Sequence, residues 1–328
     1  MNMNRRAFGA GLAGLAATLL IPRRVLACAV SRSSITVQEL RTGVWVLSQR
    51  GGRGKTAGNA LLIATEDGPV LVDTMFGSMS DDLLSDVVRL GGRGPTAIIN
   101  SHHHPDHTGG NFIFTPKPRI IAHANLAPRL SNTIETQIKP MVVQQARALR
   151  ARGDVDQAQE LLSRAATFRV DDFAPTQTLT DELKLTIGGV DIEIHHLGAA
   201  HTDNDIIVMV PGHGIVHMGD LLWTGLHAFI DRSSGASAAG WQAALSKADS
   251  LLSAGSIVVP GHGTLTDRTA LPVQSAYFDQ LRDVVSAAID EGRTRDEIRA
   301  MKPDVFRDLG FKQLEPKCLD AMYDELAG

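Results

Sequence analysis

Four side chains that can bind a metal ion stand within six positions of this sequence, at His102, His104, Asp106 and His107. Thr108-Gly109-Gly110 follows the last histidine. Imidazole and carboxylate together suit zinc or a neighbouring transition metal. A short loop that holds all four can direct two of them to one ion and two to a second. We therefore interpret the run as half of a two-metal site, in preference to a polar, histidine-rich surface turn.

A two-metal site needs more ligands than one loop supplies, and the chain offers three more. His201, Asp220 and His262 each follow a short apolar run that is typical of a buried strand, and so does the run that begins at His102. Sheets of α/β proteins place their binding groups at the carboxyl ends of strands. We therefore expect all seven side chains to converge on one edge of the fold.

This pattern resembles the metallo-β-lactamase superfamily over about residues 35–268. The resemblance implies an α/β fold, namely a four-layer αββα sandwich. It implies that His102, His104 and His201 hold a first metal ion. It assigns three further side chains to a second ion, and one carboxylate to a bridge between the two ions. These are Asp106, His107 and His262 for the second ion, and Asp220 for the bridge.

The resemblance also gives roles to residues that do not bind the metals. Asp73, after the apolar run 70–72, matches the family's Asp that braces the ligand loop; the alternative is a simple strand-ending turn residue. Three other side chains are candidates for substrate contact. His227 and Trp223 lie in the loop after Asp220, and His123 ends the apolar run 119–122.

One further histidine has misleading neighbours, because Pro211-Gly212-His213-Gly214 repeats the letters around His262. The apolar runs 206–210 and 215–218 on either side would form a hairpin that leaves the ligand edge and returns to it. At about 3.3 Å per residue, this places His213 roughly 15 to 20 Å from the metals. We expect it in a solvent-facing turn.

Helical patterns surround the ligand segments. Residues 125–168, rich in Ala, Gln, Leu and Arg, predict a helical insertion with a break at Gly153-Asp154, which would form a wall or lid of the site. Residues 269–328 predict a C-terminal helical extension, where Thr294 and Glu297 form a capping-box signature. We interpret the extension as a structural cover, with a dimer contact as the alternative. The oligomeric state is not determined by the sequence.

Residues 1–27 form a targeting segment, excluded from the fold. Arg5-Arg6 followed by a mild apolar stretch resembles a twin-arginine signal, so we expect a periplasmic protein whose mature form has no membrane span. Lipoprotein anchoring at Cys28 is the alternative. The chain of 328 residues has a formal charge of −4 and no basic stripe, which favours a small-molecule substrate and excludes nucleic acid as a partner.

The predicted function is that of an exported hydrolase with two Zn²⁺, iron or manganese being the alternative metals. The two metals would share a hydroxide that attacks an activated acyl bond, as in a β-lactam, lactone, thioester or related ester. Asp106 and Asp220 would be the catalytic residues that orient the hydroxide and accept its proton. Two alternatives belong to other classes: an iron-containing oxidoreductase of the persulfide dioxygenase or di-iron type, and a non-catalytic accessory protein of periplasmic sulfur or quinoprotein metabolism.

Overall fold

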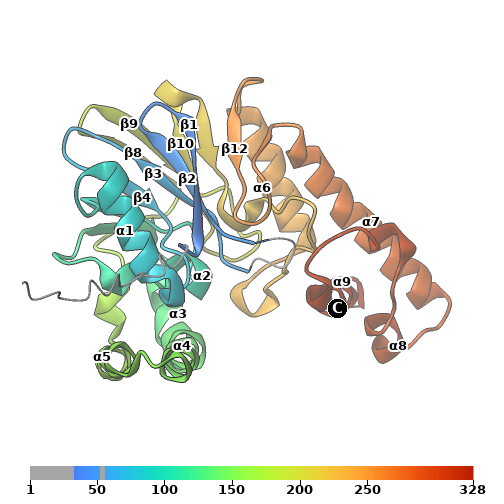
Figure 1. The fold of residues 1–328 in the computed structure, drawn as a ribbon. Helices are drawn as coiled ribbons and strands as arrows, with labels where there is room; N and C mark the ends of the chain where they lie inside the picture. The colour runs from blue at the N-terminus through green and yellow to red at the C-terminus, as the bar shows by residue number, and fades with distance from the viewer. Residues whose placement is uncertain (1–32, 52–55, 328) are drawn as a thin grey trace, which may run out of the picture. The chain divides into compact units, whose positions relative to one another are not determined.

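A computed structural model describes residues 33–51 and 56–327 of the chain (Figure 1). The predicted export signal at residues 1–27 and the predicted lipidation position Cys28 lie outside the described residues. None of the helices in the described part combines the length and the apolar character needed to cross a membrane.

The first sheet contains seven strands that follow one another in chain order. Neighbours are antiparallel from the first strand to the fourth and parallel from the fourth to the seventh. Its central strands are apolar on both faces, as a sheet that is covered on both sides requires. The strands are β1 (Ile35–Arg41), β2 (Val44–Gln49), β3 (Ala60–Ile63), β4 (Val70–Val72), β5 (Ala97–Ile99), β6 (Arg119–His123) and β7 (Gln177–Leu179).

The second sheet contains six strands in the order β13-β12-β11-β10-β9-β8. All of its neighbours are antiparallel except β11 and β12, which are parallel. The strands are β8 (Glu182–Ile187), β9 (Val190–His195), β10 (Ile207–Val210), β11 (Ile215–His217), β12 (Ile257–Val259) and β13 (Thr266–Asp267).

Successive side chains of a strand point to opposite faces of its sheet, so each sheet packs against a different layer on each face. In β4, Val70 and Val72 pack between the two sheets, whereas Leu71 packs with side chains of α1 (Ser80–Gly91). In β11, Ile215 packs between the sheets, whereas Val216 faces the opposite way, in the core that includes α6 (Ala238–Leu251) and α7 (Ala270–Asp290). The order of layers is helix, sheet, sheet, helix, which confirms the predicted αββα sandwich (Figure 1).

Further helices occupy the predicted insertion and extension. Three α-helices and a π-helical turn lie between β6 and β7, and the Gly153-Asp154 break falls between two of them, with Gly153 at φ 92°. The capping box at Thr294 is confirmed, since its hydroxyl accepts from the Glu297 N–H. The remaining helices are α2 (Pro105–Thr108), α3 (Leu126–Thr133), α4 (Lys139–Arg152), α5 (Val155–Ala166), α8 (Arg295–Arg299) and α9 (Glu315–Ala327).

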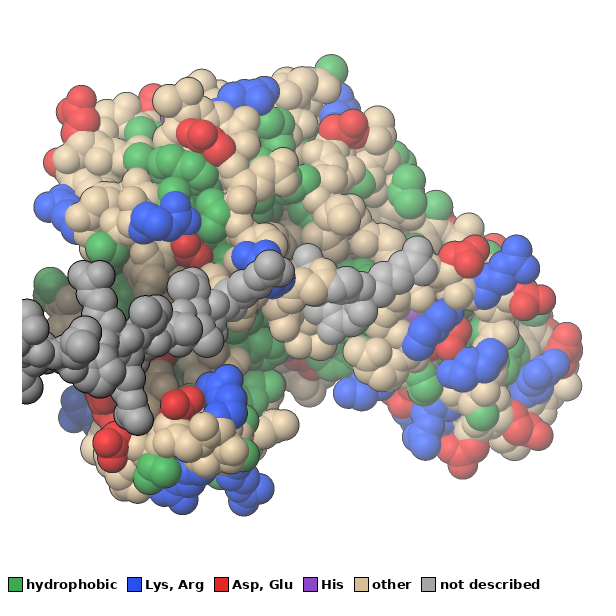
Figure 2. Space-filling model, in the orientation of Figure 1, with side chains coloured by type: hydrophobic (Ala, Val, Ile, Leu, Met, Phe, Trp, Pro, Cys, Tyr) green, Lys and Arg blue, Asp and Glu red, His purple; other side chains and the backbone are tan. Residues whose placement is uncertain are grey.

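The surface over the C-terminal helices carries charges of both signs. On the face drawn in Figure 2, basic and acidic side chains are interspersed in the part that contains α8 and α9. Arg295 pairs with Asp320 and Asp324 there, at 2.7 Å and 3.0 Å. Paired charges of this kind form a solvated surface and give this face no single-sign field.

Strand direction explains why the candidate ligands meet. In the first sheet β4 and β5 are parallel, so Asp73 and the run after β5 leave the sheet at the same edge. In the second sheet β11 and β12 are parallel, so Asp220 and His262 also leave together. β10 runs antiparallel to β11, and Pro211–His213 forms the turn between them. His213 therefore lies at the other end of these strands, as predicted.

Candidate metal centre

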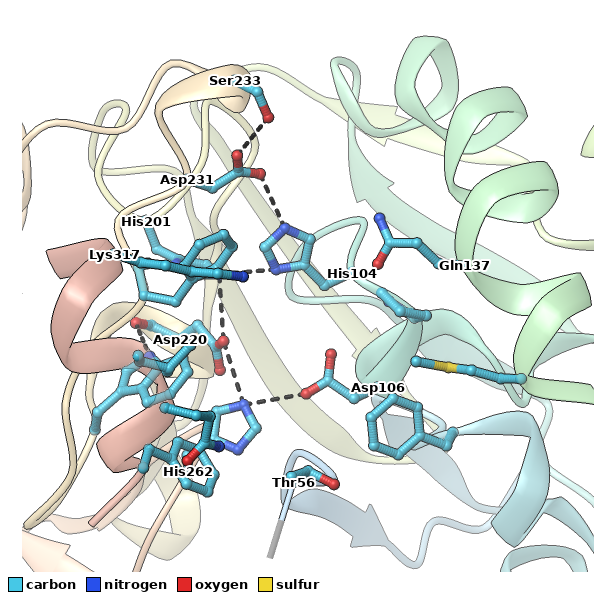
Figure 3. Close-up of a pocket in the computed structure, with 18 residues that line it drawn as sticks. Thr56, His104, Asp106, Gln137, His201, Asp220, Asp231, Ser233, His262 and Lys317 are labelled. Carbon is cyan, nitrogen blue, oxygen red and sulfur yellow. Dashed lines mark hydrogen bonds and ion pairs between the residues drawn. The ribbon is translucent and has the colours of Figure 1, made fainter. Parts of the chain in front are cut away.

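The structure brings all seven candidate ligands together in two groups. In the first group, the ligand atoms of four side chains lie within 4.8 Å of one another, and in the second group those of three do so. Figure 3 shows members of both groups facing one another across a pocket. The first group is His102, His104, His201 and Asp220, and the second is Asp106, His107 and His262. These are the two sets that the family resemblance implies, with Asp220 in the first.

The spacing within the first group suits a tetrahedral ion. His201 Nε2 lies 3.0 Å from His104 Nδ1 and 3.3 Å from Asp220 Oδ2. His102 Nε2 lies 3.7 Å from the same oxygen. Ligand atoms bound at about 2.0–2.1 Å to a tetrahedral zinc ion are separated by about 3.3 Å. The observed separations scatter around this value.

The second group has the same spacing and shares Asp220 with the first. Asp106 Oδ2 lies 3.1 Å from His262 Nε2 and 3.5 Å from His107 Nε2. Asp220 Oδ1 lies 3.2 Å from His107 Nε2, and its Oδ2 lies 3.4 Å from His262 Nε2. Because Asp220 contacts histidines of both groups, it occupies the position that a bridging carboxylate needs.

The hydrogen bonds behind His201 and His104 orient the inner nitrogen of each neutral ring as an acceptor. His201 Nδ1 donates to the carbonyl of Phe229 at 2.6 Å, and His104 Nε2 donates to Asp231 Oδ2 at 3.0 Å. The two nitrogens that face each other at 3.0 Å are therefore acceptors, and acceptors repel unless a cation lies between them. His102 Nε2 is a further inner nitrogen that is buried without a hydrogen-bond partner among the described residues. The residues present thus fit metal ions.

Asp73 holds the ligand loop from behind. Its carboxylate accepts from the Ser101 N–H, the Ser101 hydroxyl and His107 Nδ1, each at 2.7 Å. Asp73 is fully buried and has φ 61°, a left-handed conformation that is strained for a residue other than glycine. The three hydrogen bonds offset this strain and orient the His107 ring, so the structure gives Asp73 more than the role of a turn residue.

Close backbone packing brings the second sheet up to the ligands. A Cβ atom on Gly261 would lie 2.0 Å from Asp220 Oδ1, which is far inside van der Waals contact. Gly219 has φ 51°, and its Cβ would lie 2.7 Å from Ser101 Cβ. Only glycine fits these two positions without moving Asp220 or the loop that begins at Ser101.

Burial and neighbouring charge set the protonation states of the candidate ligands in the metal-free protein. Burial holds the pKa of His102 well below its ordinary value and lowers the pKa of His201 to about 4, so both rings are neutral. Burial opposes ionisation of Asp220, but His262 and His107 hold the pKa of Asp220 well below its ordinary value. Burial also opposes protonation of His262, yet Asp220 and Asp106 raise the pKa of His262 to about 9.

Zinc binding near neutral pH is expected to release protons. A ligand imidazole must be neutral, whereas His262 and His107, whose pKa is also raised, are protonated in the metal-free protein at pH 7. The apparent zinc affinity of the second group should therefore rise with pH up to about 9. Calorimetric titration with zinc in buffers of different ionisation enthalpy measures the released protons. Zinc affinity that stays constant from pH 7 to 9 would contradict this prediction.

Asp231 is a residue of the site that the sequence analysis missed. Its carboxylate accepts from His104 Nε2 at 3.0 Å and from the Ser233 hydroxyl at 2.5 Å. Burial opposes its charge, but these hydrogen bonds hold the pKa of Asp231 well below its ordinary value. A carboxylate behind a metal-binding histidine fixes the ring and raises its basicity. Asp231 is separated from His104 by 127 positions, and no short motif marks such a pair.

Replacing Asp231 by asparagine is expected to weaken metal binding at the first group by about 10- to 100-fold, the usual effect of losing such a partner. The reason is that the amide leaves the His104 ring with a weaker acceptor. Competition with a chromogenic zinc chelator measures the change. Ser233→Ala, which removes only one hydrogen bond to Asp231, should have a smaller effect; equal zinc affinity in Asp231→Asn and the unaltered protein would refute the assignment.

A pocket of about 460 Å³ opens over the two groups. Its floor includes His104, His201, Asp106, Asp220 and His262 (Figure 3). Aromatic and aliphatic side chains form much of its walls, and they come from the segment after β4, from the insertion, from the loop after Asp220 and from the C-terminal extension. These side chains are Phe76, Met141, Trp223, Phe229, Phe311 and Leu314.

Of the three predicted substrate contacts, Trp223 lines the pocket. Its ring packs on His262 with centroids 4.2 Å apart, and its indole N–H donates to the carbonyl of Asp220 at 2.9 Å. Since that N–H is already bonded, Trp223 offers an apolar ring face to a ligand.

The structure places the other two predicted contacts, His227 and His123, outside the lining of this pocket. His227 is fully buried away from the pocket, where its Nδ1 lies 3.2 Å from the Tyr277 hydroxyl. The cause is the backbone pairing of its segment with Gly310, which turns His227 toward the C-terminal extension. His123 Nε2 donates to the carbonyl of Thr180 at 3.1 Å and its ring packs on His196, so His123 joins structural elements.

Comparisons with known proteins agree with this geometry. A family model described as the metallo-beta-lactamase superfamily matches residues 53–262. A protein named metallo-beta-lactamase type 2 from Bacillus cereus is 24% identical over 73% of this chain and 80% of its own length. A second protein of that name, from Bacteroides fragilis, is 29% identical over 27% of this chain, a match that spans 36% of its own length.

Solved structures with the same fold are more distant in sequence. A metallo-beta-lactamase from Pontibacter korlensis has a TM-score of 0.56 at 18% identity and covers 75% of this chain and 99% of its own. A metallo-beta-lactamase from Pseudomonas aeruginosa in its mono-zinc form has a TM-score of 0.54 at 17% identity and covers 75% and 95%. At these identities the likeness establishes the fold.

Proposed function

Because this chain belongs to the metallo-beta-lactamase superfamily and gathers two metal-binding groups, we propose that it is an exported, zinc-dependent hydrolase of an activated acyl bond. The observation that carries the proposal is the set of inward lone pairs at tetrahedral spacing on the pocket floor. His104, His201 and Asp220 belong to this set, and their ligand atoms are 3.0 Å to 3.3 Å apart. Imidazole and carboxylate ligands in this number suit zinc or a neighbouring transition metal better than magnesium or calcium, which prefer oxygen ligands.

Two metal ions, when bound, supply a hydroxide at neutral pH and polarise the acyl oxygen of the substrate. Carboxylates of the chain would then accept the proton that the attacking hydroxide loses. Asp106 is half-buried and lines the pocket, so it can take the hydroxide proton and pass it to the leaving group. In the hydrolysis as a whole, the water oxygen would end in the product carboxylate, and the proton carried by Asp106 would end on the leaving group whose bond to the acyl carbon is broken.

The apolar walls support this chemistry by excluding water. Phe229 packs on His104 and His201 with ring centroids 5.9 Å and 6.1 Å apart, and Trp223 packs on His262. A low-dielectric wall strengthens the electrostatic interactions on the pocket floor. The substrate class proposed here is a β-lactam, a lactone, a thioester or a related ester.

The proposal that the protein is exported rests on the sequence alone. The pair Arg5-Arg6 and the short apolar stretch after it support a twin-arginine route to the periplasm, which carries folded proteins and would allow metal loading before export. Replacing both arginines by lysine should stop export. Unchanged export of that variant would refute this part of the proposal.

The proposed function is tested by metal analysis combined with a hydrolysis screen. We expect about two equivalents of zinc in natively loaded protein, and hydrolysis of at least one compound among a chromogenic cephalosporin, lactones, thioesters and aryl esters. Chelation should abolish hydrolysis and zinc should restore it. Iron with a visible absorption band and no hydrolysis would favour the oxidoreductase class instead. Protein that contains no bound metal and hydrolyses none of these compounds would favour an accessory protein.

A further inference from the structure

The C-terminal extension forms one wall of the pocket over the metal groups. Phe311, Gln313, Leu314 and Lys317 all line it, and all lie beyond residues 53–262, which the family model matches. Figure 3 shows Lys317 extending from its helix on the side of the pocket where His201 lies. This wall is therefore a feature of the part of this chain outside the matched range, and it faces the position where a substrate would lie.

Several contacts hold this wall in place. The Gly310 N–H donates to the carbonyl of Gly225 at 2.9 Å, and the His227 N–H donates to the carbonyl of Gly310 at 3.1 Å. Phe311 follows with φ 54°, and its ring lies 5.6 Å from both the Trp223 and the His262 rings, measured between centroids. A bulky residue keeps such a strained conformation only where its surroundings enforce it. The extension is thus fastened to the loop that follows Asp220.

Lys317 brings a positive charge to this wall. Its Nζ lies 5.4 Å from the centroid of the Phe229 ring, which itself packs on His104 and His201. Among the described residues that line the pocket, Lys317 is the one lysine or arginine. In the described part of the chain no carboxylate lies within ion-pair distance of its Nζ. Its ammonium group is consequently available to a ligand.

The acidic groups nearby are already engaged. Asp106 and Asp220 face the histidines of the metal groups, and Asp231 accepts from His104. Glu315, two positions before Lys317, is buried and pairs with Lys302 at 2.9 Å. Lys317 also stands in the first turn of α9, a helix of 13 residues whose amino end favours negative charge. Lys317 and the amino end of α9 thus both favour an anion at this wall.

We propose that Lys317 is a specificity-determining residue that binds a carboxylate of the substrate, so that the substrate is an amphiphilic anion with its acyl bond on the pocket floor. The apolar body of such a substrate would pack between Phe229, Phe311 and Met141, which line the same pocket. This inference rests on the proposed hydrolase function. The alternative is that Lys317 only shields the Phe229 ring, and the experiment below separates the two.

The test compares two chromogenic esters of matched length, mono-4-nitrophenyl glutarate, which is anionic, and 4-nitrophenyl pentanoate, which is neutral. In Lys317→Gln we expect kcat/KM to fall about tenfold for the anion, mostly through KM, and less than twofold for the neutral ester. Lys317→Arg should keep most of the preference for the anionic ester over the neutral one. Lys139→Gln is the matched control, because Lys139 pairs with Glu135 on the insertion and does not line the pocket.

Binding gives a readout that does not depend on turnover. Glutaranilic acid and pentananilide keep the shapes of the two esters with an unactivated amide, and calorimetric titration of the zinc-loaded protein measures their affinities. Lys317→Gln should weaken glutaranilic acid about tenfold and leave pentananilide unchanged. An equal loss of affinity for both ligands, or no loss of affinity for either, would overturn the proposal that Lys317 binds the carboxylate. If the unaltered protein binds glutaranilic acid more tightly than pentananilide but hydrolyses neither ester, the hydrolase function is refuted, and only the carboxylate-binding role of Lys317 is supported.

Discussion

Asp220→Ala is expected to lower kcat/KM for any hydrolysed substrate by at least about 10³-fold, because several kcal/mol of metal-ion stabilisation depends on the two ions being held together. Asp220 lies within 3.2 Å to 3.7 Å of four histidine nitrogens in both groups. Its loss removes the carboxylate that lies beside histidines of both groups. Steady-state kinetics and zinc analysis of the same preparation measure the effect, and zinc content should fall below two equivalents.

The matched control for this experiment is Asp308→Ala, because the Asp308 side chain is 91% exposed and makes only one ion pair, with Arg307 at 3.7 Å. Its kinetics and zinc content should not change. The Asp220 variant should keep its fold, since the apolar cores between and outside the sheets do not include Asp220. Full activity of a correctly folded Asp220→Ala protein with two zinc ions would show that the bridge is not needed for hydrolysis.

The ligand set could be predicted because the candidate ligands follow short apolar runs that are typical of buried strands. β5, β11 and β12 are short apolar runs, and their residues pack into cores between and outside the two sheets. The same rule separated His262, beyond β12, from His213, which lies in the turn between β10 and β11 despite identical neighbours. The ends of strands can be predicted from a sequence when its hydrophobic runs are short and well separated.

The residues that the sequence did not predict are those placed by long-range loop packing. Asp231 acts on His104 from a loop without regular structure, and Lys317 reaches the pocket from a helix near the end of the chain. His227 lies in the same loop as Asp231 but is turned away from the pocket by the pairing with Gly310. Periodicity indicates which face of a helix or strand is buried, but it does not predict where a loop crosses another element.

Removal of the metal is expected to destabilise the protein more strongly as pH rises. A ligand present at 1,000 times its Kd stabilises the folded state by about 4.1 kcal/mol, and each kcal/mol corresponds to about 2–4 °C in Tm for a domain of 150–250 residues. Two such sites predict a loss of more than about 10 °C on chelation. Differential scanning calorimetry of zinc-loaded and zinc-stripped protein measures this difference.

The pH dependence of the metal-free protein follows from His262. Its pKa is about 9 in the fold, raised by Asp220 and Asp106 against the effect of burial, and about 6.5 in the unfolded chain. A raised pKa contributes stability that is fully present below about pH 6.5 and is lost as pH rises toward 9, because the imidazolium that balances the buried carboxylates disappears. Bound zinc replaces that charge, so the loaded protein should keep its Tm over the same range. The stabilisation by zinc should therefore grow between pH 6.5 and 9. Parallel Tm curves for the two forms would show that zinc does not take the place of these protons.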